Sequence, residues 1–250
     1  MAWPATVPLS LVSAPMTSIL AIDTSTEACS VALYRDGEVS ACYEVVPRRH
    51  NQHLLAMLQN LLPRGSLASS GVEAVAYGSG PGSFTGLRIA ASAVQGLCFA
   101  AALPALPIST LACQTYTAQR LGLVYEGDLV LSTLDAHIGE LYWALYEVGR
   151  ERLQELTVAA AARPADLVLP GTRKMVAIGS GLRYLDAFSV AVQSRFAAQH
   201  GELLPAARDL LPPALMALRE GKVQAAEDVC PVYVRDEISW KKLSEQGPQR

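Results

Sequence analysis

Apolar and polar positions in the first part of the chain alternate in blocks typical of strands. Residues 18–22 and 29–34 are apolar and β-favouring, and a third such run covers 38–46. Asp36-Gly37 separates the second run from the third, and this pair favours a tight hairpin because Gly tolerates a positive φ. The pattern predicts that the ordered chain begins with a three-stranded meander.

Two helices and a further strand are predicted next. Residues 50–62 carry leucines at a helical period, and Pro63 ends the pattern. A strand over 73–77 leads into a glycine-rich run, and a second helix follows over about 87–102. The first half therefore has the order β-β-β-α-β-α.

The second half repeats this plan. Strands are predicted at 129–134, 140–148 and 152–158, and Val176–Gly181 matches Val75–Gly80 almost letter for letter. Internal self-similarity of this kind indicates a duplicated architecture. From residue 201 onward several prolines interrupt the helical pattern, so the second copy is expected to be reduced.

Two β-β-β-α-β-α lobes, each with Asp after its first strand, resemble the actin, sugar-kinase and heat-shock ATPase (ASKHA) superfamily. The expected fold is α/β, with helices on the faces of two mixed sheets. We expect a disordered leader at 1–16, an N-terminal actin-like lobe at 17–115 and a smaller C-terminal lobe at 116–250. The last helix could return to the first lobe.

Composition narrows the function. The 250 residues are 51% apolar and 17% charged, with a net charge of −3, which argues against a protein that holds a nucleic-acid backbone by itself. Five scattered cysteines without a CxxC pair fit a reducing cytoplasm rather than a disulfide or zinc framework. No run approaches the roughly 20 apolar residues of a membrane span, so we expect a cytoplasmic protein without a membrane partner.

A glycine-rich run from Gly78 to Gly86 connects a predicted strand to a predicted helix, where backbone N–H groups attract anions. A Walker A loop would have Lys after the last Gly, but Leu87-Arg88 follows, and a dinucleotide fingerprint would have Gly where Ser83 stands. A tight structural turn is the favoured interpretation.

The segment after the first strand is a second candidate for phosphate binding, since actin-like kinases bind phosphate there. Together with the glycine-rich run it could contact a nucleotide, and its Asp could hold a magnesium ion with the Asp of the second lobe. The alternative is that each Asp caps its own turn, and this structural interpretation is favoured. The candidate nucleotide or phosphate contacts are Asp23, Thr24, Ser25, Gly80, Gly82, Ser83 and Asp135.

The two helices of the first lobe are more apolar than one lobe needs. The second has almost no polar face, and helices that are apolar all round are buried on both sides. Its outer side could pack between the lobes or against another subunit, and the pattern alone leaves both open. The residues that we expect at a partner interface are His53, Leu54, Met57, Leu58, Leu61, Gly86, Ile89, Ala90, Ala93, Gly96 and Leu97.

Catalytic patterns are not found in the sequence. The four histidines, His50, His53, His137 and His200, form no HExxH motif, and no Ser lies in a GxSxG elbow. We therefore predict no catalytic residue, no metal site and no cofactor.

Four segments resemble the TsaB (YeaZ) family: Ile19–Thr26 (ILAIDTST), Gly78–Arg88 (GSGPGSFTGLR), Asp135–Tyr142 (DAHIGELY) and Tyr233–Asp236 (YVRD). The resemblance covers about residues 17–242, and the GPGSFTGLR run is highly specific. It implies a non-catalytic scaffold or activator that forms a heterodimer with a catalytic TsaD-like subunit. With a TsaE-like ATPase, that pair transfers a threonylcarbamoyl group to N6 of the adenosine beside the tRNA anticodon.

The resemblance also implies how this subunit meets its partners. The first-lobe helix pair binds the TsaD-like subunit, a homodimer forms through the same face when the subunit is alone, and tRNA is met only through the complex. The catalytic relative carries a metal-binding HxxxH, and Thr110 and Gln114 occupy both His positions here. A hydroxyl and an amide are poor ligands for a transition metal. The alternatives are an ATP-dependent kinase or phosphotransferase and, more remotely, a peptidase.

Overall fold

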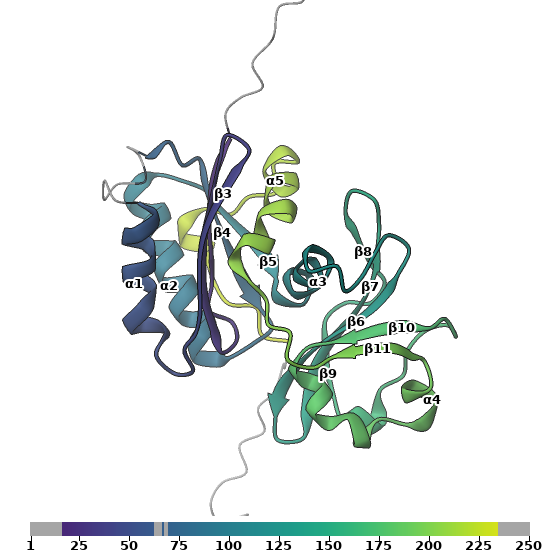
Figure 1. The fold of residues 1–250 in the computed structure, drawn as a ribbon. Helices are drawn as coiled ribbons and strands as arrows, with labels where there is room; N and C mark the ends of the chain where they lie inside the picture. Colours follow the sequence, from purple (N-terminus) through teal and green to yellow (C-terminus); the bar gives the residue numbers. More distant parts are fainter. Residues whose placement is uncertain (1–16, 63–66, 68–69, 235–250) are drawn as a thin grey trace, which may run out of the picture.

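The computed structural model describes residues 17–62, 67 and 70–234. The expected disordered leader at 1–16 lies outside the described residues, as do residues 235–250. Two mixed sheets form the framework, and helices cover their faces (Figure 1).

The first sheet has the strand order β3-β2-β1-β4-β5, with β1 antiparallel to β2 and parallel to β4. Asp36 and Gly37 connect β2 to β3 with φ values of 53° and 88°, which confirms the predicted Asp-Gly hairpin. The strands are β1 (Ser18–Asp23), β2 (Ala28–Arg35), β3 (Glu38–Val45), β4 (Ala74–Gly80) and β5 (Ala105–Ser109).

Helices α1 (His50–Leu61) and α2 (Phe84–Ala101) lie on one face of this sheet, while α3 (Thr110–Arg120) and α5 (Leu211–Arg219) lie on the other (Figure 1). Helix α2 begins three residues earlier than predicted. Ser83 caps it, because the Ser83 hydroxyl accepts a hydrogen bond of 3.3 Å from the Gly86 N–H.

The second sheet has the order β11-β10-β6-β7-β8, with β9 paired to β7. Its first three strands form the same meander as in the first sheet, and its last two pair in the same parallel manner. Its strands are β6 (Leu129–His137), β7 (Glu140–Val148), β8 (Leu153–Glu155), β9 (Ala160–Ala162), β10 (Met175–Ile178) and β11 (Phe196–His200).

The helices of the second lobe are short. Where α2 follows β4 in the first lobe, a 3₁₀ segment (Ser180–Ala187) and the four-residue α4 (Val190–Gln193) follow β10. The duplicated actin-like fold with a reduced second lobe is therefore confirmed. Further 3₁₀ segments among the described residues are Pro164–Asp166, Ala207–Leu210 and Ala226–Asp228.

The end of the described chain lies on the first lobe. Leu211 and Ala214 of α5 share a buried core with Ile19 and Ala21 of β1. Farther on, the Val232 N–H donates a hydrogen bond of 2.7 Å to the Ser79 carbonyl. Helix α3 continues across the 115/116 boundary expected from the sequence and contacts strands of both sheets.

Candidate functional site

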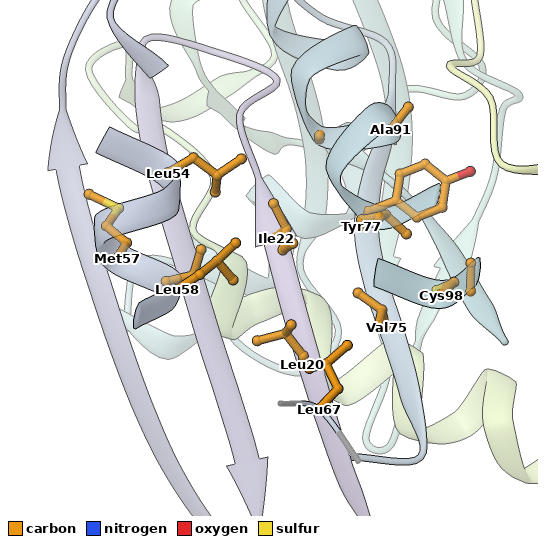
Figure 2. Close-up of a cluster of buried hydrophobic side chains, with 14 of the residues drawn as sticks. Leu20, Ile22, Leu54, Met57, Leu58, Leu67, Val75, Tyr77, Ala91 and Cys98 are labelled. Carbon is orange, nitrogen blue, oxygen red and sulfur yellow. The ribbon is translucent and has the colours of Figure 1, made fainter. Parts of the chain in front are cut away.

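The inner sides of α1 and α2 are part of the largest core of the first lobe. Leu54, Met57 and Leu58 of α1 are buried in the same core as Leu20 and Ile22 of β1, and Figure 2 shows Leu54 and Leu58 on the side of α1 that faces Ile22. These side chains stabilise the lobe itself by removing apolar surface from water.

The outer sides of the same helices expose large apolar side chains to solvent. Leu55 is 65% exposed, Phe84 53% and Phe99 80%. Contiguous exposed apolar surface marks interaction sites on soluble proteins. A groove of about 480 Å³ lies on this side, and we call it the helix-pair groove; it is lined by Asn51, Leu54, Leu55, Phe84, Thr85, Arg88, Ile89, Ser92 and Ala93.

The residues expected at the interface divide into two groups. Leu54, Met57, Leu58, Gly86 and Ala90 are buried, so these side chains belong mainly to the core of the lobe and only Leu54 also borders the groove.

The other six are reachable from solvent: His53, Leu61, Ile89, Ala93 and Leu97 are half-buried, and Gly96 is exposed. The residues expected from the sequence do not include Leu55, Phe84, Arg88 and Ser92, which line the groove, or Phe99, which is exposed. The apolar residues on the second side of the α2 pattern indicate only that an outer face exists.

Helix α2 also meets one test for a membrane span. It has 18 residues and is the one helix in the described part of the chain that is long and apolar enough. The expectation that no run approaches the length and apolar composition of a membrane span is therefore wrong. Its inner side packs on β4 with Ala90, Val94 and Cys98 buried, as in the core helix of a globular lobe.

The glycine-rich run packs against the turn that follows β1. The Ser83 N–H donates a hydrogen bond of 2.7 Å to the Ser25 carbonyl, and the Thr24 hydroxyl donates one of 2.7 Å to the Gly86 carbonyl. A Cβ at Gly82 would lie 2.3 Å from the Ser25 oxygen. The close approach of the two loops is therefore sufficient to explain why position 82 is glycine, and a role in phosphate binding is not needed to explain it.

Gly80, the other candidate glycine of this run, is also explained by a close contact with a backbone carbonyl group. Gly80 has a φ of +129°, and a Cβ there would lie 2.4 Å from the Val232 carbonyl oxygen. Glycine at position 80 thus leaves room for the segment around Val232, which packs on the first lobe.

Asp23 ends β1 and is fully buried. Its Oδ1 accepts hydrogen bonds from the Ser25 N–H at 2.9 Å and the Ser25 hydroxyl at 2.8 Å, whereas its Oδ2 has no partner in the described structure. Burial raises the pKa of Asp23 from 3.8 to about 6, against the lowering effect of the Ser25 bonds. Asp23 thus acts chiefly as a turn cap.

This burial gives a prediction for stability. Because the pKa of Asp23 is raised on folding, its contribution is most favourable below pH 4 and is lost as the pH rises to about 6. We expect Asp23→Asn to raise the free energy of unfolding at pH 7.5 by up to about 3 kcal/mol, and to have little effect at pH 4. Urea denaturation at both pH values measures this, and equal effects at the two would contradict it.

Asp135 lies near the end of β6, the counterpart of β1 in the second lobe, but its neighbours differ from those of Asp23. It accepts hydrogen bonds from the His137 N–H at 2.8 Å, the Tyr184 hydroxyl at 2.8 Å and the Arg183 guanidinium at 2.7 Å. Burial opposes ionisation, but these bonds and the nearby His137 hold the pKa of Asp135 below its ordinary value. The carboxylate is thus engaged within its own lobe.

Asp135→Asn serves as the counterpart of Asp23→Asn. Because folding lowers the pKa of Asp135, its contribution is present above pH 4 and is lost as the pH falls further. The two variants should therefore change the pH dependence of stability in opposite directions.

Thr110 and Gln114 lie on α3 and are fully buried. The Gln114 amide donates a hydrogen bond of 2.8 Å to the Leu203 carbonyl and accepts one of 2.7 Å from the Ser132 hydroxyl. Both ends of this side chain are thus engaged, and neither residue supplies an imidazole. The two positions do not fit a transition-metal site.

Two of the four histidines contact carboxylates rather than nucleophiles. His53 Nδ1 lies 2.8 Å from Glu44 Oε2, and His137 Nδ1 lies 3.5 Å from Asp135 Oδ2. Neither arrangement contains a Ser or Cys that the ring could activate.

Comparison with known proteins agrees with this fold. Residues 9–237 match the family model described as TsaD: tRNA N6-adenosine threonylcarbamoyltransferase. The tRNA threonylcarbamoyladenosine biosynthesis protein TsaB of Escherichia coli is 40% identical over 230 residues, which are 90% of this chain and 97% of the relative.

Solved structures give the same result. YeaZ from Pseudomonas aeruginosa is 39% identical, with a TM-score of 0.79 over 87% of this chain and 100% of that chain. A second structure, described as an uncharacterized protein with similarity to peptidase YEAZ from Pseudomonas aeruginosa, gives a TM-score of 0.80 at 39% identity over 88% of this chain and 100% of that chain.

These matches define the chain first as an actin-like protein with a TsaD-type domain. Within that class, the chain belongs to the TsaB (YeaZ) family. The resemblance seen in the four sequence segments is thereby confirmed.

Proposed function

We propose that this chain is a non-catalytic subunit that binds a TsaD-like catalytic subunit through the helix-pair groove and thereby supports threonylcarbamoyl transfer to tRNA. The TsaB relatives place it in tRNA threonylcarbamoyladenosine biosynthesis. The observation that carries the proposal is the exposed apolar outer side of α1 and α2, with Leu55, Phe84 and Phe99 open to solvent.

The chemistry of this surface favours a protein partner. A specific interface buries about 1,600 Å² in total and has an apolar centre. Small residues at Ala93 and Gly96 allow another helix to approach closely, and a Cβ at Gly96 would meet nothing within 4 Å. In the absence of the TsaD-like subunit, a second copy of this chain would cover the same groove.

A scaffold role is supported by the residues at two positions: Gln114, where the catalytic relative has a metal-binding His, and Asp23, where an actin-like kinase would bind phosphate. Gln114 is bonded to Ser132 and Leu203, and Asp23 is sealed beneath its own turn. The net charge of −3 fits a subunit that meets tRNA through the complex rather than alone.

Reconstitution tests this proposal. Purified TsaD-like and TsaE-like subunits should modify tRNA only when this chain is added, and the chain alone should not. Modification at an equal rate without the chain would contradict the proposal.

The competing functions have tests of their own. An actin-like kinase would bind Mg-ATP as an isolated chain, so calorimetry that shows micromolar binding would favour it over a scaffold. A peptidase would cleave a protein substrate in a manner abolished by replacing one Ser or His. We expect no Mg-ATP binding, because the loops that would hold phosphate are packed against each other. We expect no cleavage, because His53 and His137 contact carboxylates rather than a Ser or Cys.

A further inference from the structure

Arg88 is the one permanently charged side chain on the two helices of the helix-pair groove. The sequences of α1 (HNQHLLAMLQNL) and α2 (FTGLRIAASAVQGLCFAA) contain no Asp, Glu or Lys. Of the two histidines of α1, His50 is buried and His53 is paired with Glu44. A single cation therefore borders an otherwise neutral groove.

Aromatic rings hold this cation in place. The Arg88 guanidinium carbon lies 3.6 Å from the centroid of the Phe84 ring and 5.9 Å from that of Tyr233. The two rings are 5.7 Å apart, so the C-terminal part of the described chain contributes to the same cluster. Stacking on rings orients a guanidinium while leaving its N–H donors free at the edge.

The charge of Arg88 is not neutralised within the described chain. Its side chain is exposed, and among the described residues no carboxylate lies within 4.0 Å of it. Arg88 also lies near the N-terminus of α2, where the helix macrodipole gives a cation no stabilisation. The fold of the lobe thus gives no electrostatic reason for a cation here.

We propose that Arg88 is a specificity-determining residue that pairs with a carboxylate on an amphipathic helix of the TsaD-like subunit. This inference depends on the proposed function, because it names the chemistry that the partner brings to the groove. Apolar side chains of that helix cover Leu55, Ile89 and Ala93, and an Asp or Glu at its edge meets the free donors of Arg88. Burial of this pair by the surrounding apolar contacts strengthens it.

A nucleic-acid occupant fits this surface less well. A phosphate backbone requires several cations in a row, whereas Arg88 is the single cation among the residues that line the groove. Besides Arg88, only Asn51, Thr85 and Ser92 of the lining could donate side-chain hydrogen bonds to sugar or phosphate groups.

The charge also distinguishes the heterodimer from a homodimer. A second copy of this chain brings another Arg88 to the interface but no carboxylate on either helix. The heterodimer alone gains an opposite-charge pair, and such complementarity selects between partners. Raising the ionic strength should therefore weaken the heterodimer while leaving the homodimer unchanged or strengthened.

The experiment compares Arg88→Glu, Arg88→Gln and Ala93→Arg in calorimetric titrations with the purified TsaD-like subunit, at low and high salt. Thermal unfolding of each variant verifies that it is folded. We expect Arg88→Gln to weaken binding about 10-fold and Arg88→Glu about 100-fold. Arg88→Gln should also lose most of the salt dependence, and reversal of one acidic residue of the partner should restore binding to Arg88→Glu.

The outcomes separate the two proposals. If Arg88→Glu binds as the unmodified chain does while Ala93→Arg does not, the charge pair is wrong and the docking site stands. If both variants bind normally, the docking site itself is wrong. If no single reversal on the partner restores binding to Arg88→Glu, or if reversing an acid of this chain restores it, the pair with the partner is overturned.

Discussion

Ala93→Arg is expected to abolish binding of this chain to the TsaD-like subunit. Ala93 lines the helix-pair groove and is half-buried before any partner arrives. A guanidinium there would be removed from water without a counter-charge, which costs several kcal/mol, and its length would hold the two helices apart. We expect binding to weaken by at least about 3 kcal/mol, beyond detection in co-purification.

The matched control places the same charge elsewhere. Val190 is 83% exposed on α4 of the second lobe, so Val190→Arg should co-purify with the TsaD-like subunit in normal yield. Sedimentation of each mixture shows the complex or its loss. Normal complex formation by Ala93→Arg would mean that the partner binds another surface.

Gly86→Ala is expected to lower the stability of the chain itself. A Cβ at Gly86 would lie 1.9 Å from the Thr24 carbonyl oxygen, which belongs to the backbone and cannot rotate away. Relief of this clash requires the glycine-rich run and the β1–β2 turn to separate and breaks the bond from the Thr24 hydroxyl. We expect a loss of at least about 2 kcal/mol in the free energy of unfolding.

Gly96→Ala provides the comparison within the same helix. A Cβ at Gly96 meets nothing within 4 Å, and the backbone there is helical. Alanine should therefore stabilise the chain by about 0.5 to 1 kcal/mol through helix propensity. Thermal unfolding should shift downward for Gly86→Ala and upward for Gly96→Ala, and shifts of the same sign would contradict the packing of the loops.

The fold was largely predictable from local patterns. The Asp36-Gly37 turn determines its hairpin almost alone, and the match of Val176–Gly181 to Val75–Gly80 indicates the duplication. The sequence pattern predicts the start of α2 three residues too late, because Thr85 and Gly86 are weak helix formers, although Ser83 is a recognisable cap.

The roles of individual site residues were less predictable, because they depend on distant contacts. The run that contains Gly82 and Gly86 resembles a phosphate-binding loop in sequence. Yet glycine is required at these two positions because the carbonyl groups of Ser25 and Thr24, about sixty residues earlier, lie too close for a Cβ atom. No local pattern contains that information.

The helix stripes show a related limit. The sequence predicts Leu54 and Leu58 at a partner interface. Both are buried in the lobe core, although Leu54 also borders the groove, and the adjacent Leu55 is exposed. A helix that is apolar on two sides does not reveal from its sequence which side faces its own sheet. The surface role of Arg88 likewise depends on Phe84 and on Tyr233, which lies far along the chain.

Site-specific photo-crosslinking tests the docking surface most directly. A photoreactive phenylalanine analogue at Ser92, which is exposed and lines the helix-pair groove, is compared with the same analogue at Val190 on the second lobe. Irradiation of the complex should join position 92 to the TsaD-like subunit and leave position 190 uncoupled. Crosslinks from position 190 but none from position 92 would contradict the assignment of the helix-pair groove as the docking surface.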